Sequence, residues 1–139
     1  MGLYNFDPQF EPAIMADTKR HTIRAKRKHP DKPGKLLYLY TGLRHKGARL
    51  LKVRRCVRVQ DIRIEGGWES HSGEFFGAVY IDGSQIILDE LAQLAMSDGF
   101  GTFDEMMEFW RGRLPFSGDI IHWESDVEYR RSLKKGNYI

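Results

Sequence analysis

Apolar residues recur along this chain with the spacing of β-strands more often than with the spacing of helices. Leu36–Thr41 is almost continuously apolar, which predicts a strand covered on both faces. Asp82–Gly83 separates two short apolar runs and is typical of a hairpin turn. Further strands are expected at Leu3–Asp7, Leu50–Val59, Val79–Ile81, Gln85–Ile87 and Gly118–Trp123.

The segment Leu50–Val59 has a second pattern within it. Its odd-numbered positions from 51 to 59 are mostly apolar, while the even-numbered ones are Lys52, Arg54, Cys56 and Arg58. Because successive side chains of a strand point to opposite faces, we expect one buried face and one basic face in contact with solvent. Cys56 is the only cysteine, so it is expected to be a passive, buried or half-buried thiol in a reducing cytoplasm.

Helical patterns are confined to short segments. One or two helical turns are expected at Phe10–Ala16, and Asp89 is expected to cap a helix that ends near Met96. Thr102 and Glu105 form a capping box. The apolar positions that follow at helical spacing predict a buried face made of Phe103, Met106, Met107 and Trp110.

Together these elements predict an α+β fold, a small and mostly antiparallel β-barrel with short helices packed on its side. Residues 1–125 are expected to form the domain and residues 126–139 a loose charged tail, while 66–77 is expected to be a mobile loop. No apolar run approaches the length that spans a bilayer, and the first residues lack the pattern of a secretory signal. We therefore expect a soluble, cytoplasmic protein without a membrane contact.

Charge is divided unevenly along the chain, which carries a net charge of +3. Residues 19–63 contain sixteen Lys and Arg against two acids, whereas residues 64–110 contain ten Asp and Glu and no Lys or Arg. A positive field of this kind attracts polyanions such as nucleic acids. Alternatively, the two halves neutralise each other across the fold or between copies. The five histidines share no metal-like spacing with carboxylates, so neither a metal nor another cofactor is expected.

Two stretches resemble a known family when they are taken together. In Ile14–Arg24, a short helix leads into Lys19, with Thr22 and Arg24 at alternate positions; in Leu94–Trp110, an Asp-Gly-Phe turn precedes a helix that ends in Phe-Trp. Over about residues 3–123 the chain resembles the ASCH domain family, which belongs to the PUA-like superfamily of RNA-binding domains. Asp17 stands where that family has a glycine, and Arg20 follows the Lys where Thr is common.

The resemblance implies a PUA-like β-barrel that binds RNA or nucleotides in a basic cleft beside the Lys19–Arg24 loop. Some members of the family are amidohydrolases that deacetylate a modified cytidine, and others have been linked to RNA cleavage. The Lys and Thr of the amidohydrolases fall on Lys19 and Thr22, and their carboxylate, a Glu, falls on or near Asp98. A Thr hydroxyl needs a base to become a nucleophile, and a desolvated Lys can serve as that base.

Three functions stay open from the sequence. The first is an RNA- or nucleotide-binding module whose contacts come from Lys19, Arg20, Arg24, Tyr40 and Arg54. The second is a hydrolase, either an amidohydrolase or a ribonuclease, that uses Lys19, Thr22 and Asp98. The third is an interaction domain whose basic face meets an acidic protein. An enclosed Lys19 beside Thr22 and a carboxylate favours catalysis, whereas a Lys19 that extends into solvent favours binding.

Overall fold

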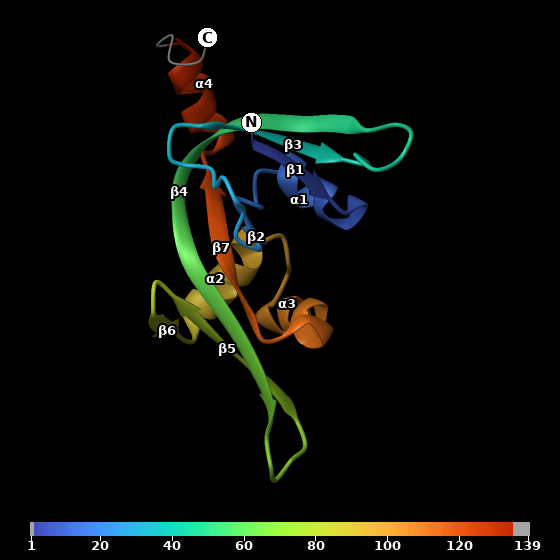
Figure 1. Cartoon of the computed structure of the whole chain (residues 1–139), viewed down its shortest axis with the longest axis vertical. Helices are drawn as coiled ribbons and strands as arrows, with labels where there is room; N and C mark the ends of the chain where they lie inside the picture. The colour runs from blue at the N-terminus through green and yellow to red at the C-terminus, as the bar shows by residue number, and fades with distance from the viewer. Residues whose placement is uncertain (1, 135–139) are drawn as a thin grey trace.

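The computed structural model describes residues 2–134. These residues form four α-helices and seven strands. The fold is α+β, as predicted (Figure 1). The strands are β1 (Gly2–Phe6), β2 (His21–Arg24), β3 (Leu36–Thr41), β4 (Arg49–Trp68), β5 (Phe75–Ile81), β6 (Ser84–Ile86) and β7 (Phe116–Trp123). The α-helices are α1 (Glu11–Met15), α2 (Asp89–Ser97), α3 (Phe103–Trp110) and α4 (Asp126–Lys134); short 3-10 turns are η1 (Pro8–Phe10) and η2 (Arg111–Arg113).

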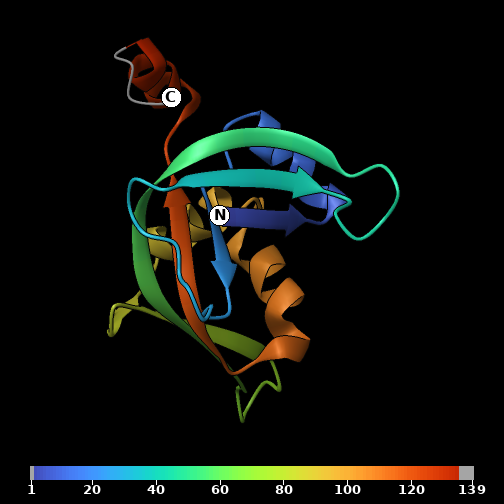
Figure 2. The same cartoon turned by 45° about the horizontal axis from the view of Figure 1, so that its top comes forward.

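One mixed sheet contains all seven strands, and β4 runs through it as a long curved strand (Figure 1). Its order is β1-β3-β4-β5-β6, while β7 joins β4 to β2. Every pairing is antiparallel except that of β1 with β3. Figure 2 shows the sheet curled over the helices. Within residues 2–134 no strand ladder joins β1 to β2, so backbone pairing leaves the curled sheet open between these two strands.

The prediction of which residues of β4 face the core and which face solvent is wrong for the first half of the strand. Arg54 is buried although it was expected on the solvent side, and Val57 is exposed; Cys56 is fully buried, as expected for its thiol although not from the alternation. The pairing of β4 shifts register twice, opposite Leu39 and Tyr40 of β3 and between Cys56 and Arg58 along β7, so the residues between these two bulges have exchanged faces. The predicted loop 66–77 is also wrong at its ends, because β4 and β5 continue as a paired hairpin and enclose only residues 69–74.

The C-terminal segment is helical rather than loose over residues 126–134. Asp126, the first residue of α4, accepts a hydrogen bond from Nζ of Lys52 at 2.7 Å and another from the Arg54 guanidinium. These contacts fasten the helix to the side of β4 that was expected to face solvent. The part of the predicted tail from 135 to 139 lies outside the described residues.

The core consists of two clusters. One lies between the β4–β7 part of the sheet and helices α2 and α3, and it contains Ile62, Ile64, Val79, Met106, Trp110 and Ile120. The other lies between β1, β3 and β7 and contains Tyr4, Phe6, Leu37, Leu39, Cys56 and Trp123. Phe100 and Phe109 pack against both clusters. The turn at residue 98, which precedes Phe100, is therefore held where the two clusters meet.

Helix α3 confirms the capping prediction. The Thr102 hydroxyl accepts a hydrogen bond from the Glu105 N–H at 3.1 Å, and the Glu105 carboxylate accepts one from the Gly101 N–H. Met106, Met107 and Trp110 are buried as expected, whereas Phe103, expected with them, is only partly buried at the start of the helix. Helix α2 begins differently, because Leu88 rather than Asp89 occupies the capping position. None of the helices formed by residues 2–134 is long and apolar enough to cross a membrane.

Candidate functional site

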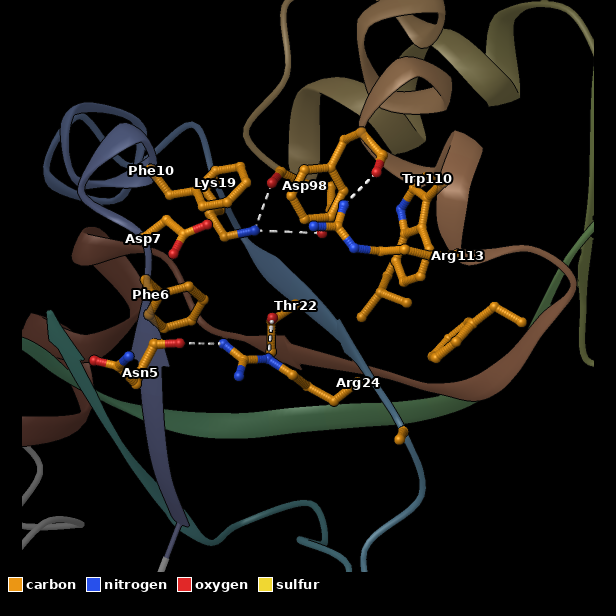
Figure 3. A pocket seen from close by; sticks show the side chains of 14 residues that line it. Asn5, Phe6, Asp7, Phe10, Lys19, Thr22, Arg24, Asp98, Trp110 and Arg113 are labelled. Atoms are coloured by element: carbon orange, nitrogen blue, oxygen red, sulfur yellow. Dashed lines mark hydrogen bonds and ion pairs between the residues drawn. The ribbon is translucent and has the colours of Figure 1, made fainter. Parts of the chain in front are cut away.

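A cavity of about 420 Å³ occupies the opening between β1 and β2. Its walls come from the end of β1 and the turn after it, from Lys19 and residues 22–25, from Asp98, and from the end of α3 through to the start of β7. Figure 3 shows Lys19 pointing toward Asp98 on one wall, with Thr22 and Arg24 beside them on β2. This volume falls within the range of sites that enclose a small organic ligand.

The turn after helix α1 directs Lys19 into this cavity. Asp17 has a φ of 66°, in the left-handed region that ends many helices and that glycine favours. Aspartate tolerates this conformation better than most residues, which explains how Asp17 stands where the resembled family has glycine. The N–H groups of Thr18 and Lys19 both donate to the Ala13 carbonyl at 3.0 Å, so the chain folds back against the helix end.

Lys19 is enclosed rather than exposed, with only 2% of its surface accessible. Its Nζ donates to the main-chain oxygen of Asp98 at 2.5 Å and lies 3.3 Å from the Asp98 Oδ1. That carbonyl belongs to the last turn of α2, where unpaired carbonyls attract a cation. Gly99 permits the approach, because its φ is 99° and a Cβ at this position would lie 3.1 Å from Cδ of Lys19.

Burial changes the ionisation of this pair. Desolvation lowers the pKa of Lys19 below that of a surface lysine, although the Asp98 carboxylate acts in the opposite direction. Desolvation also raises the pKa of Asp98 to about 6, against the opposing effect of Lys19. At neutral pH Asp98 is therefore a carboxylate, and it faces a lysine that releases its proton more readily than usual.

Thr22 and Arg24 lie on the same face of β2 because they are two residues apart. Nε of Arg24 donates to the Thr22 Oγ1 at 2.9 Å, and its Nη2 donates to the Asn5 carbonyl at 2.7 Å. Arg24 thus bridges β2 to β1 across the opening that no ladder closes. In an extended strand, Lys19 and Thr22 would point to opposite faces because they are three residues apart. Lys19 reaches the same cavity as Thr22 because it lies in the loop before β2 begins.

Sequence reasoning missed His21 as a neighbour of this site. Its side chain is 2% exposed, and its Nε2 lies 3.4 Å from the Asp98 Oδ1 without forming a hydrogen bond. Its ring meets that of His122 edge to face, with centroids 5.1 Å apart. Burial holds the pKa of His21 well below its usual range, so the ring is neutral. Along β2 the side chains of His21 and Thr22 point to opposite faces of the strand, and nothing in the sequence connected His21 with Asp98.

Three residues expected to bind a ligand do not line the cavity. Arg20 donates to the Trp123 carbonyl and to Glu128, and Arg54 is paired with Asp126. Tyr40 lies on β3, away from the lining residues. The positive charge of residues 19–63 therefore does not form one continuous free surface, because Lys19, Lys52 and Arg54 form ion pairs. Arg113, which was not predicted, lines the cavity and lies over the Phe109 ring.

Comparison of the chain with family models, curated proteins and solved structures found no match. Among residues 2–134, no three His, Cys, Asp or Glu side chains are grouped in a way that holds a metal ion. The chemistry of the cavity is therefore argued from its lysine, threonine, carboxylate and arginine groups.

Lowering the pH from 7 to 5 is expected to destabilise the protein through His122. Burial, Arg58 and Arg20 lower its pKa to about 4, whereas the unfolded chain titrates near about 6.5. The unfolded state therefore binds the proton first, and stability that is fully present above about pH 6.5 is lost as the pH falls toward the folded value, by at most about 3 kcal/mol. Urea unfolding at both pH values measures the loss.

The variant His122→Gln isolates this effect from two other titrations. His21, whose pKa is also lowered by burial, loses stability in the same direction, whereas Asp98, with its raised pKa, gains stability as the pH falls through about 6. We expect the variant to lose less stability between pH 7 and 5 than the parent. The exposed His45→Gln variant serves as the matched control. An equal loss in the parent and in His122→Gln would contradict the assignment to His122.

Proposed function

We propose that this chain is an ASCH-type, PUA-like domain whose cavity binds a nucleoside or nucleotide and hydrolyses an amide on its base. Deacetylation of an acetylated cytidine is the reaction we infer. The observation that carries this proposal is the enclosed Lys19, which is tied to Asp98 and shares one cavity with Thr22. The curled sheet that opens at this cavity supports the PUA-like barrel that forms part of the same proposal.

Thr22 is the nucleophile in this proposal. Its oxygen accepts the hydrogen bond from Nε of Arg24, so its own hydrogen remains available for a base. The amine form of Lys19 takes that proton while Oγ1 of Thr22 bonds to the amide carbonyl carbon. The guanidinium beside the oxygen stabilises the negative charge that develops during the attack.

Lys19 then acts as the acid. Its ammonium returns the proton to the leaving nitrogen of the base, and the acyl group stays on Thr22 as an ester. Water attacks this ester with Lys19 again as the base, which releases the acid and restores Thr22. Asp98 holds Lys19 in place through two contacts and balances its charge at each protonated stage.

The cavity also offers groups that suit a nucleotide. Phe6 and Phe10 present aromatic rings beside Lys19, which can contact a base. Arg24 and Arg113 supply guanidinium groups for a phosphate or a carbonyl oxygen. Since Arg24 forms no ion pair with Asp98 among the described contacts, its charge remains directed at the cavity. This feature favours a second candidate function, nucleotide or RNA binding without turnover.

Incubation of the purified protein with acetylated cytidine, its 5′-monophosphate and a short RNA tests both candidates. We expect acetate and the deacetylated base, and we expect kcat/KM to fall as the pH drops, because the amine form of Lys19 that serves as the base becomes protonated. Thr22→Val should abolish turnover while keeping ligand binding, since it removes only the hydroxyl. Thr18→Val, outside the cavity, is the matched control.

Unchanged turnover by Thr22→Val would overturn the assigned nucleophile. Binding without any product would favour the second candidate, and cleavage of the RNA would favour the ribonuclease alternative. If none of the three compounds bound to the protein or was converted to product, the nucleotide proposal would be ruled out.

A further inference from the structure

A second hollow of about 290 Å³ lies on the opposite side of β2 from the Lys19 cavity. Strand β2 and residue 20 before it form one wall, β4 and β7 form the floor, and α2 closes the far side. His21 belongs to this hollow, while its sequence neighbour Thr22 belongs to the Lys19 cavity. The mechanism proposed above does not use any group that opens into the second hollow.

The charged groups around this hollow are mainly cationic. Arg58 is exposed, and no hydrogen bond or ion pair of its side chain occurs within residues 2–134. Arg20 contributes a second guanidinium, held in place by the Trp123 carbonyl and by Glu128. Glu90 is the only carboxylate in the lining, and it is exposed to solvent. Two guanidinium groups thus converge on this recess, where the counter-charges are the solvated Glu90 in the lining and Glu128, which pairs with Arg20.

The polar groups on the floor are ordered in advance. The Gln60 amide donates through Nε2 to Asp82 at 3.0 Å, so its Oε1 is the acceptor for Nε2 of His122 at 2.8 Å. This arrangement fixes the neutral His122 with its proton on Nε2 and leaves Nδ1 unprotonated. An anion beside the ring would favour a second proton on His122, because it offsets the repulsion from Arg20 and Arg58.

We propose that this second hollow, lined by Arg20, Arg58 and His122, binds a phosphate group. Guanidinium groups match the oxygens of a phosphate in geometry as well as in charge. Free inorganic phosphate and a phosphodiester of a nucleic-acid strand offer the same chemistry. The site is separate from the Lys19 cavity and stands whether or not the amidohydrolase proposal holds.

The position of His21 gives the site a functional consequence. Its ring lines the hollow and packs against His122, while its Nε2 faces the Asp98 carboxylate 3.4 Å away. A phosphate beside His122 therefore lies one side chain away from the carboxylate that holds Lys19. A phosphate bound in the second hollow would therefore change the electrostatic potential in the Lys19 cavity.

NMR of the histidine rings tests the proposal directly. Inorganic phosphate is titrated into the full chain, with ionic strength held constant by sodium chloride, and a short single-stranded RNA is titrated in a second arm. We expect saturable shifts of the His122 ring and a rise of at least one unit in its apparent pKa. Arg58→Gln should weaken binding at least fivefold. Arg63→Gln, an exposed arginine on the same strand but outside this hollow, should not change it.

The two arms distinguish the sources of the phosphate. Saturation by inorganic phosphate identifies a free-phosphate site, whereas a His122 shift with RNA alone identifies a site for a strand. No His122 shift in either arm, or a shift that survives Arg58→Gln unchanged, would overturn the proposal. Because Lys19 does not line this hollow, repeating the titration in Lys19→Met separates this result from the fate of the Lys19 cavity.

Discussion

Replacing Lys19 with methionine is expected to lower kcat/KM on an acetylated cytidine by roughly 10²- to 10⁴-fold, the range found when a general base is lost. Methionine keeps the apolar stem against the Phe10 ring but removes Nζ and both of its contacts with Asp98. Asp98 then stays buried without its counter-charge, so its pKa should rise further above about 6. Steady-state kinetics and a pH titration of the Asp98 carboxyl by NMR measure the two effects.

Lys26→Met provides the matched control for this variant. Lys26 is an exposed lysine that forms ion pairs with Asp61 and Asp119 outside the Lys19 cavity. The Lys26→Met substitution removes the same charge from the same basic part of the chain. An equal loss of activity in both variants would therefore show that the loss comes from the change in net charge and not from removal of a base. A folded Lys19→Met variant with full activity would remove Lys19 from the mechanism.

Replacing Gly118 with alanine is expected to destabilise the protein by about 1–3 kcal/mol and to disrupt ligand binding at the same time. A Cβ at this position in β7 would overlap the main-chain oxygen of Arg24 and lie 2.6 Å from the Phe116 ring. The backbone of β2 cannot yield without moving Arg24, which connects the strand to β1. Thermal unfolding and ligand titration should therefore both report the substitution.

Gly112→Ala is the control, because a Cβ at Gly112 would meet no atom within 4 Å. We expect that variant to keep the stability and binding of the parent. If Gly118→Ala lost stability but kept its affinity, the placement of β2 would matter less to the cavity than the contacts of Arg24 imply.

Local patterns in the sequence predicted the elements whose interactions are local. The Thr102 capping box and the apolar spacing behind it suffice for α3, since every group involved lies within a few residues. The faces of β4 were mispredicted because its two bulges depend on the partner strands β3 and β7, and Trp123, the partner of Cys56, lies 67 residues further along the chain. The helix at residues 126–134 was missed because Asp126 is held by Lys52 and Arg54, contacts that sequence periodicity cannot reveal.

For the candidate site too, local motifs could be predicted and contacts between distant segments could not. The motif around Lys19 and the turn at Asp98 were identified from the sequence, and the structure brings both to one cavity although they are 79 residues apart. Arg54 was expected at a ligand but pairs with Asp126, since charge composition does not specify a partner. His21 was missed because its proximity to Asp98 arises from the packing of β2 against the end of α2.

Strand β2 lies between the Lys19 cavity and the second hollow, so a single strand separates the two. Thr22 and Arg24 line the Lys19 cavity, whereas His21 lines the second hollow, so substitutions at adjacent positions address different chemistry. Within residues 2–134, only β7 pairs with this strand, over residues 21–24. A library that randomises the strand should therefore separate variants at Thr22 and Arg24 from those at His21, and the His21 variants should also affect the Lys19 cavity, because that ring lies against Asp98.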